Sequence, residues 1–337
     1  MSSSNAIADG PRSRPGSKFN YSVAASYIAK DKPYDPATHL FHFSPYHHVG
    51  PPKRGKGKAE RPESGQDAFF VSRVGDSGAV ALGIADGVGG WMNSGVDPAD
   101  FSHALCDYMA AAAARTMDGT LEVANLGDSG FVHLRLNAVH AASTPQTHAF
   151  NTPFQLSVVP PVMLLRAAAF GGGQLMDQPR DAKVTRHDLR HGDVLIFASD
   201  GLWDNLFNQD ILRIVSHAMV GPGAWATTEG GVTVAPDLKP FTQPDTEPGA
   251  ESGSGTEATH APSSRPQRPR ATLQSMIASR IVGAAKAASV NKKLDGPFAK
   301  EVKRYYPHER WYGGKVDDIC VVTVVVSSEE AAPEAKL

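Results

Sequence analysis

Residues 80–91 read Val-Ala-Leu-Gly-Ile-Ala-Asp-Gly-Val-Gly-Gly-Trp, a short apolar strand that ends in an aspartate followed by glycines. A similar device, an apolar strand beside an aspartate that glycine or a second acid flanks, recurs at Asp128, Asp200 and Asp317. A carboxylate at a hydrophobic strand end is costly to bury unless its charge is compensated, and a divalent cation compensates it well. The pattern therefore predicts a metal site built from strand ends.

The surrounding sequence predicts strands and helices rather than a repeat or a coiled coil. Two apolar strands flank a Gly-Asp-Ser-Gly turn at 75–78 and are expected to form a hairpin. Strands are expected at 19–29, 68–74, 80–85, 121–124, 131–136, 193–198 and 319–326, and helices at 99–115, 209–219 and 273–289.

The composition is that of a globular protein. Of 337 residues, 41% are hydrophobic and 20% are charged, and the net charge is -2, so nothing indicates a nucleic-acid partner. The apolar runs have strand length, which argues against an integral membrane segment. Cys106 and Cys320 form no CxxC pair, so neither a disulfide framework nor a structural zinc site is expected. A monomer is the default.

One domain is expected over 19–326, with a disordered insertion at 221–270 that is rich in Pro, Gly, Ser and Thr, and a tail at 327–337. The segment 1–18 is expected to be disordered. It is Ser-rich, and Arg12, Arg14 and Lys18 stand against the single acid Asp9, which leans toward an organellar transit peptide. The segment lacks a clear amphipathic stripe, however, so an ordinary disordered tail is the preferred interpretation.

Oxygen-only ligands select hard ions, Mg²⁺ or Mn²⁺. Glycine beside a carboxylate lets the backbone approach closely, so the Gly87 carbonyl could also serve as a ligand. Two such ions sharing a water would activate it to attack a phosphoryl group in line, without any nucleophilic side chain. Taken singly, Asp67 or Asp128 is better explained by an ordinary turn than by a metal ligand. The ordered set of aspartates is the stronger indication.

That ordered set resembles the protein phosphatase 2C family of metal-dependent Ser/Thr phosphatases. The motif Asp-Gly-Val-Gly-Gly-Trp at 86–91, with Phe-Gln-Leu at 154–156, is most similar to the sequences of the family's mitochondrial branch, which is linked to coenzyme Q biosynthesis. The resemblance implies an α+β fold, a β-sandwich of two antiparallel sheets flanked by helices in α-β-β-α layers. The motifs that carry it are Gly65-Gln66-Asp67-Ala68-Phe69-Phe70, Ala85-Asp86-Gly87-Val88-Gly89-Gly90-Trp91, Gly127-Asp128-Ser129-Gly130, Ala198-Ser199-Asp200-Gly201-Leu202-Trp203-Asp204-Asn205 and Gly314-Lys315-Val316-Asp317-Asp318-Ile319.

The resemblance also implies roles at matching positions. The substrate would be a phosphoprotein, hydrolysed at phosphoserine or phosphothreonine, and Asp86, Asp200 and Asp317 would be the catalytic acids. Mitochondrial localisation is implied, with the cytoplasm as the alternative. In the family pattern, Asp86 bridges two metals, Gly87 binds one through its carbonyl, and Asp200 and Asp317 hold the other. Asp67 acts through water, Asp128 and Asp204 hold a weaker third ion, and Gln66 and Asp318 lie outside the direct ligands. The family's phosphate-binding arginine has no counterpart in register; Arg61 lies nearby and is a candidate, but a plain surface arginine is the preferred interpretation.

Two features depart from the family. Val88 stands where many relatives have a histidine proposed to protonate the leaving alcohol, so another acid or a metal-bound water would do so here. The interval between Trp91 and Leu121 is too short for the helices and central strand expected there. Either coding sequence is missing or the chain is a degraded relative. The alternative to an active phosphatase is therefore a weak or inactive one that acts as a binding protein.

Overall fold

The computed structural model describes residues 19–43, 61–74, 78–112, 119–157, 177–244 and 271–328. Its main feature is a six-stranded antiparallel sheet in the order β2-β1-β14-β11-β6-β7. The strands of this sheet are β1 (Phe19–Ile28), β2 (Leu40–His42), β6 (Gly130–Arg135), β7 (Ala138–Ala142), β11 (Val194–Ala198) and β14 (Ile319–Ser328).

Strand β14 lies at the centre of this sheet because both of its faces are apolar. Its sequence begins Ile-Cys-Val-Val-Thr-Val-Val-Val, and every residue up to Ser327 is buried. Such a continuous apolar run is typical of a strand covered on both faces. It pairs antiparallel with β1 on one side and with β11 on the other.

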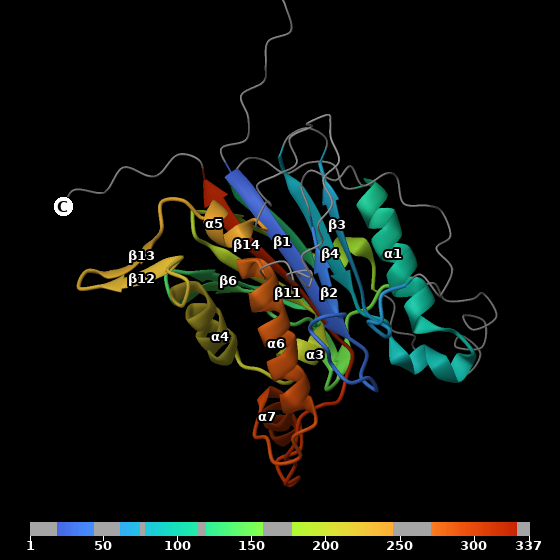
Figure 1. Ribbon diagram of the computed structural model, residues 1–337. Coiled ribbons are helices and arrows are strands. Elements are labelled where there is room, and N and C mark those ends of the chain that lie inside the picture. The colour runs from blue at the N-terminus through green and yellow to red at the C-terminus, as the bar shows by residue number, and fades with distance from the viewer. Residues whose placement is uncertain are drawn as a thin grey trace, which may run out of the picture.

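Helices cover one face of the sheet. Helix α6 packs on β1 and β14, and α4 packs on α6 (Figure 1). Ile277 and Ile281 lie one helical turn apart on α6 and are fully buried in this layer. The helices on this side and at its lower end are α3 (Asp200–Trp203), α4 (Asn208–Val220), α5 (Lys239–Thr242), α6 (Leu273–Ser289) and α7 (Pro297–Tyr305).

The opposite face of the sheet is covered by two separate ribbons. One pairs β3 (Ala68–Arg73) with β4 (Val80–Ala85), and the other pairs β5 (Thr120–Asn125) with β10 (Lys183–Asp188). Helix α1 (Pro98–Ala112) packs outside the first ribbon, at the right of Figure 1. The remaining short elements are β8 (Thr147–Ala149), β9 (Thr152–Pro153) and the 3-10 turns η2 (Gly89–Ser94) and η3 (Pro179–Asp181).

The predicted α+β architecture with a large antiparallel sheet is confirmed. The second β layer differs from a continuous sheet, because among the described strands none joins the two ribbons. This is the place where the short interval between Trp91 and Leu121 predicts a missing strand. On α1, Tyr108 is 77% exposed and Met109 47% exposed, as expected for apolar side chains that lack a covering element.

The prediction of disorder over 221–270 is wrong for residues 221–244. These residues form a hairpin of β12 (Trp225–Thr228) and β13 (Gly231–Val234), followed by α5. Trp225 is fully buried, and its indole Nε1 donates to the Gly192 carbonyl at 3.1 Å. Trp225 and the fully buried Leu238 anchor a segment whose average composition is that of a linker. Residues 245–270 lie outside the described residues.

The predicted chain ends differ little from the structure. The first two residues of the predicted tail, Ser327 and Ser328, belong to β14 instead. Residues 1–18 and 329–337 lie outside the described part of the chain. In the described residues, no helix is long and apolar enough to span a bilayer.

Candidate metal site

The topology brings the predicted acids to one edge of the main sheet. Strand β11 runs antiparallel to both β14 and β6, so its carboxyl end lies beside the starts of its two neighbours. Ala198 pairs with Val321 on β14 and with Gly130 on β6. Asp200, which follows β11, therefore meets the segments just before β14 and β6, and these carry Asp317 and Asp128.

The β3–β4 ribbon supplies two further acids to the same place. Ala68 at the start of β3 pairs with Ala85 at the end of β4. The residues just outside this pair are Asp67 and Asp86, so they face each other across the ribbon's open end. The Asp86 carboxyl lies within hydrogen-bonding reach of Asp200.

Burial makes these carboxylates hard to ionise. It raises the pKa of Asp86 well above its usual value, and the nearby charges of Asp67 and Asp200 raise it further. Burial, followed by the charge of Asp200, raises the pKa of Asp317 as well. Several carboxylates this close together need protons or cations to coexist.

Asp67 is the most deeply buried acid of the set, with 1% of its surface exposed. The Ser199 hydroxyl donates to its Oδ2 at 2.6 Å, whereas Oδ1 is buried without a hydrogen-bond partner. Burial raises the pKa of Asp67 well above its usual value, against the effect of the Ser199 hydrogen bond. A buried carboxylate oxygen without a hydrogen-bond partner is a suitable ligand for a cation or for a water bound to a cation.

Gly87 fits the expected backbone approach. A Cβ at this position would lie 2.8 Å from the Gln66 carbonyl oxygen and 3.0 Å from the Pro98 Cβ, so a larger residue would push the Asp86 loop away. All donors of the cluster are oxygens, which suits Mg²⁺ or Mn²⁺. The residue types therefore fit the predicted ions, although no group of three His, Cys, Asp or Glu in the described residues is already drawn into ligand geometry.

A lysine that the sequence analysis missed lies among these acids. The Lys315 Nζ is 2.6 Å from Asp200 Oδ2, 2.7 Å from Asp204 Oδ2 and 3.2 Å from Asp317 Oδ2. Burial opposes its charge, but the surrounding carboxylates outweigh burial and raise the pKa of Lys315. The sequence spacing indicates this contact, because residues two apart in an extended segment lie on the same face, and Lys315 precedes Asp317 by two.

Asp128 and Asp204 lie on the side of the cluster that Lys315 occupies. Burial and then the Asp200 charge raise the pKa of Asp128 to about 6, with Lys315 acting in the opposite direction. Burial raises the pKa of Asp204 to about 7, again with Lys315 opposing. The structure thus brings together all six aspartates of the predicted site.

The two residues expected outside the direct ligands contact each other. The buried Asp318 carboxylate accepts hydrogen bonds from the Gln66 backbone N–H at 2.8 Å and from the Lys30 backbone N–H at 2.7 Å. Asp318 therefore fixes the loop that carries Asp67 against the start of β14 and the end of β1. Arg61 is directed elsewhere, since its Nη2 forms an ion pair with Asp100 Oδ1 at 2.7 Å.

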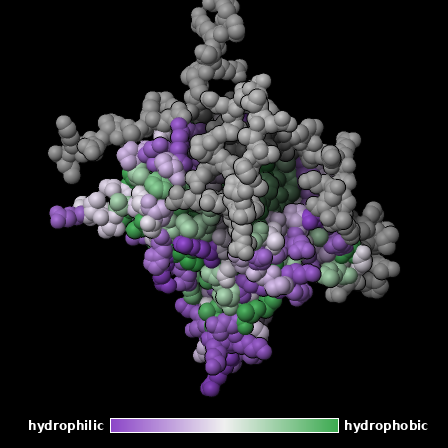
Figure 2. Space-filling view, viewed as in Figure 1, coloured by the Kyte–Doolittle hydropathy of each residue, from purple (hydrophilic) through white to green (hydrophobic). Residues whose placement is uncertain are grey.

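An aromatic and basic segment borders the acids. The Phe298 backbone N–H donates to the Asp204 carbonyl at 3.0 Å, and the Phe298 ring lies 5.7 Å from Lys315 Nζ. Helix α7 continues outward from this point to Tyr305 and Tyr306, which are about half exposed. The lower end of the molecule, where α7 lies, is largely hydrophilic in the view shown (Figure 2).

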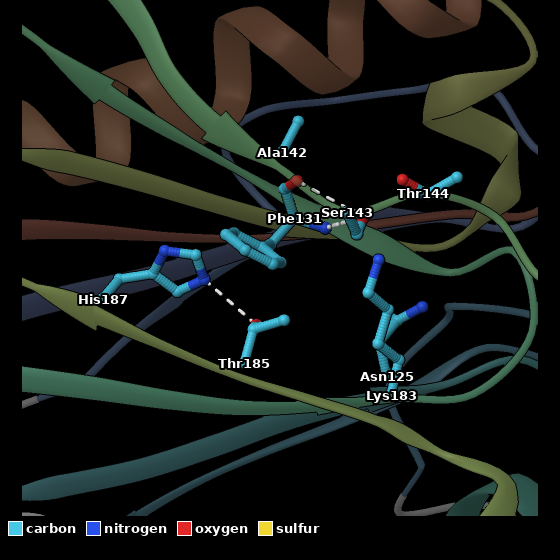
Figure 3. Close-up of a pocket in the computed structure, with 8 residues that line it drawn as sticks. All are labelled: Asn125, Phe131, Ala142, Ser143, Thr144, Lys183, Thr185 and His187. Atoms are coloured by element: carbon cyan, nitrogen blue, oxygen red, sulfur yellow. Dashed lines mark hydrogen bonds between the residues drawn. The ribbon is translucent and has the colours of Figure 1, made fainter.

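A separate small pocket of about 40 Å³ lies between β6 and the β5–β10 ribbon (Figure 3). The Phe131 and His187 rings meet edge to face with centroids 5.1 Å apart, and His187 hydrogen-bonds the Thr185 hydroxyl. None of the predicted acids lines it. The pocket lining comprises Asn125, Phe131, Ala142, Ser143, Thr144, Lys183, Thr185 and His187.

Comparisons with known proteins agree with the motifs. The chain is 36% identical over 187 residues to the human "Protein phosphatase PTC7 homolog", covering 44% of this chain and 59% of the relative. It is 29% identical over 317 residues to "Protein phosphatase PTC7 homolog fig" of Drosophila melanogaster, covering 82% and 81%. The chain thus spans about three fifths of the human relative, and it matches no family model.

A solved structure supports the fold. The X-ray structure of the photosystem II phosphatase PBCP aligns with a TM-score of 0.54 over 91% of this chain and 98% of its own, at 22% identity. At that identity the likeness concerns the fold alone. Together with the sequence relatives, it confirms the resemblance predicted from the motifs.

Proposed function

We propose that this chain, a relative of the protein phosphatase 2C family, hydrolyses phosphoserine and phosphothreonine in proteins with two bound Mg²⁺ or Mn²⁺ ions. The observation that carries the proposal is the gathering of Asp67, Asp86, Asp200 and Asp317 from four separate strand ends. Among the described residues, the ion pairs of these acids all come from Lys315. One lysine leaves most of their negative charge uncompensated.

Different carboxylates of the chain would hold the two ions. Asp86, whose carboxyl is close to both Asp67 and Asp200, would contribute to holding both ions, together with the Gly87 carbonyl. Asp200 and Asp317 would hold one ion from the main sheet, and Asp67, oriented by Ser199, would act on the other through water. When bound, such ions activate water as a nucleophile and neutralise charge on the phosphoryl group. Val88 has no proton to give to the leaving alcohol.

The activity can be tested with phosphopeptides. Purified full-length protein should release phosphate from phosphoserine and phosphothreonine peptides, and from p-nitrophenyl phosphate, in the presence of Mn²⁺. EDTA should abolish release, and excess Mn²⁺ should restore it. Release that continues unchanged in EDTA would contradict the metal requirement, and hydrolysis of phosphotyrosine peptides alone would contradict the substrate class.

A second candidate function, a binding protein with little or no catalysis, is favoured by the divided second β layer. Two unjoined ribbons support Asp67 and Asp86 less firmly than a continuous sheet would. A phosphopeptide binding measurement beside the rate assay separates the two functions. Binding without turnover in Mn²⁺ supports the binding protein, and turnover supports the enzyme.

The proposal extends to location. The Ser-rich start of the sequence, with Arg12, Arg14 and Lys18, suits an organellar targeting segment, and we propose that it directs the protein to mitochondria. A fluorescent protein carrying residues 1–30 should colocalise with a mitochondrial marker. Replacing the three basic residues by glutamine should release it into the cytoplasm, and a diffuse signal from the unaltered segment would contradict the proposal.

A further inference from the structure

Residues 292–312 carry a group of exposed aromatic side chains beside the acid cluster. The exposed fractions are 44% for Tyr305, 51% for Tyr306, 46% for Trp311 and 56% for Tyr312. Exposed apolar side chains that gather in one place mark interaction sites, and tyrosine and tryptophan are enriched at the centre of protein interfaces. The group therefore indicates a binding surface.

Phe298 joins these aromatic side chains to the acid cluster. Its backbone N–H donates to the Asp204 carbonyl at 3.0 Å, and its ring centroid lies 6.2 Å from that of Trp311. Phe150, in the short loop between β8 and β9, packs against the same group, with its ring centroid 5.8 Å from that of Phe298 and 5.5 Å from that of Tyr305. A protein segment that leaves the acid cluster on this side would therefore pass over the exposed rings.

The same segment is basic. Residues 292–312 include six Lys or Arg and three Asp or Glu. Two of the six bases pair with acids of the segment itself. Within the described part of the chain, the other four form no ion pair, and all four are exposed: Lys292, Lys293, Lys300 and Arg310. A surface with unpaired cations attracts acidic partners and discriminates against basic ones.

The surface is preformed, and the apolar side of α7 is already covered. The Tyr306 N–H donates to the Val302 carbonyl at 2.8 Å, and the Gly313 N–H donates to the Leu294 carbonyl at 2.8 Å, so the backbone on both sides of the exposed rings is fixed. Ala299 and Val302 on α7 are buried. A helix that lies on a membrane inserts its apolar face into the bilayer, whereas here that face packs on the protein, which favours a protein segment as the occupant.

We propose that residues 292–312 bind the part of the substrate protein that flanks the phosphorylated residue, and that this surface selects substrates with acidic flanks. The unpaired cations would contact Asp or Glu side chains of the substrate, and the exposed rings would pack against the rest of its segment. The inference rests on the proposed function, because the surface would act together with the metal site beside it.

The test compares two phosphothreonine peptides that differ only in having Asp or Asn at the flanking positions. In Mn²⁺, the full chain should hydrolyse the Asp peptide with a kcat/KM about 10-fold higher, as expected of a few exposed ion pairs, and the difference should lie in KM. Lys300→Gln/Arg310→Gln should reduce this ratio to about 3 or less. The matched control, Arg186→Gln/Arg190→Gln, removes two exposed cations on and after β10 and should keep the ratio. Equal values for both peptides in wild type, or an unchanged ratio in Lys300→Gln/Arg310→Gln, would overturn the inference.

A second variant tests the aromatic part of the surface. Trp311→Ala should raise KM for both peptides by about 5-fold or more, because large aromatic side chains dominate the binding energy of interfaces. Tyr108→Ala, at an exposed tyrosine on α1, is the control and should leave KM unchanged. An unchanged KM in Trp311→Ala would also overturn the inference.

Three further outcomes separate the alternatives. The preference of wild type for the Asp peptide should shrink between about 50 mM and about 500 mM salt, and a preference that persists would overturn the inference. Equal rates for both peptides, together with sedimentation of wild type but not Lys300→Gln/Arg310→Gln on phosphatidylserine vesicles, would assign the surface to a membrane instead. Absence of turnover of both peptides and of p-nitrophenyl phosphate would overturn the proposed function, and the dissociation constants of the two peptides would still decide the inference.

Discussion

The Ser199 hydroxyl joins the two β layers by donating to the buried Asp67 carboxylate at 2.6 Å. The same hydroxyl oxygen accepts the Cys320 backbone N–H at 3.0 Å, and the Ser199 N–H donates to the Cys320 carbonyl at 3.1 Å. Ser199 thereby fixes the β3–β4 ribbon to the main sheet at the point where Asp67 must stay beside Asp200. The strength of this link decides how well the acids are held.

Ser199→Ala should weaken both folding and metal binding. It removes the donor to a fully buried carboxylate, which costs about 1–3 kcal/mol of unfolding free energy. It should also lower Mn²⁺ affinity by about 10–100-fold, as loss of groups that orient ligands typically does. Urea unfolding and Mn²⁺ titration measure the two effects. Ser72→Ala, at a partly exposed serine on β3 that has no contact with the acids, is the control and should change neither.

Gly201→Ala should destabilise the turn that carries Asp200. A Cβ at this position would overlap the backbone oxygen of Asp318, so α3 would have to move away from β14. We expect a loss of about 3 kcal/mol in unfolding free energy, typical of severe overpacking. Gly90→Ala is the control, because a Cβ there meets no atom within 4 Å. Equal midpoints for both variants in urea would show that the turn is not packed as described.

The position of the acids at strand ends follows from local patterns, whereas their role as metal ligands stays a prediction. Asp86, Asp200 and Asp317 were recognised from an apolar run beside an acid, and the pairing of β3 with β4 followed from the turn between them. The contact between Asp318 and the Lys30 N–H joins residues at opposite ends of the chain, and no local pattern announces such a contact. Lys315 was missed because a lysine beside acids is usually a solvated surface residue.

The segment 221–244 shows why average composition is a poor predictor of disorder. Trp225 and Leu238 are both fully buried, but they lie among many Pro, Gly and Thr residues. Burial of two large side chains was enough to order the hairpin and α5, a tertiary effect that composition does not contain. The division of the second β layer, by contrast, followed from counting residues between two motifs, because a strand needs a minimum length.

Without metal, stability should fall as the pH rises from about 4 to about 7. The pKa of Asp204 is about 7 and that of Asp128 about 6 in the folded protein, against 3.8 for an ordinary aspartate. The unfolded chain therefore releases these protons at lower pH, which favours unfolding by up to about 1.4 kcal/mol per pH unit and group. Urea unfolding in EDTA at pH 5, 6 and 7 measures the slope.

Two comparisons check the origin of this slope. Asp204→Asn should reduce it, because one of the shifted groups is gone. Saturating Mn²⁺ should also reduce it, since a bound cation favours the ionised carboxylates. A stability in EDTA that rises from pH 5 to pH 7 would contradict the account.

The two cysteines report on packing near the site. Cys106 on α1 is 4% exposed, and burial raises the pKa of its thiol to about 12, with a further contribution from Asp107. Cys320 on β14 is fully buried, and burial raises its pKa too. Neither should react with Ellman's reagent at pH 8 in the folded protein, and both should react in guanidinium. Rapid reaction of Cys106 would show that α1 does not stay packed on the β3–β4 ribbon.

The central claim is that Asp86 helps to hold the ions that hydrolysis of the phosphoester requires. The most direct measurement is the rate of phosphate release from a phosphothreonine peptide in Mn²⁺ by wild type, Asp86→Asn and Asp188→Asn, an exposed aspartate at the end of β10. Asp86→Asn should be slower than wild type by more than about 100-fold, since even orienting groups around a metal contribute up to that factor. Asp188→Asn should match wild type. Equal rates in wild type and Asp86→Asn would contradict the account.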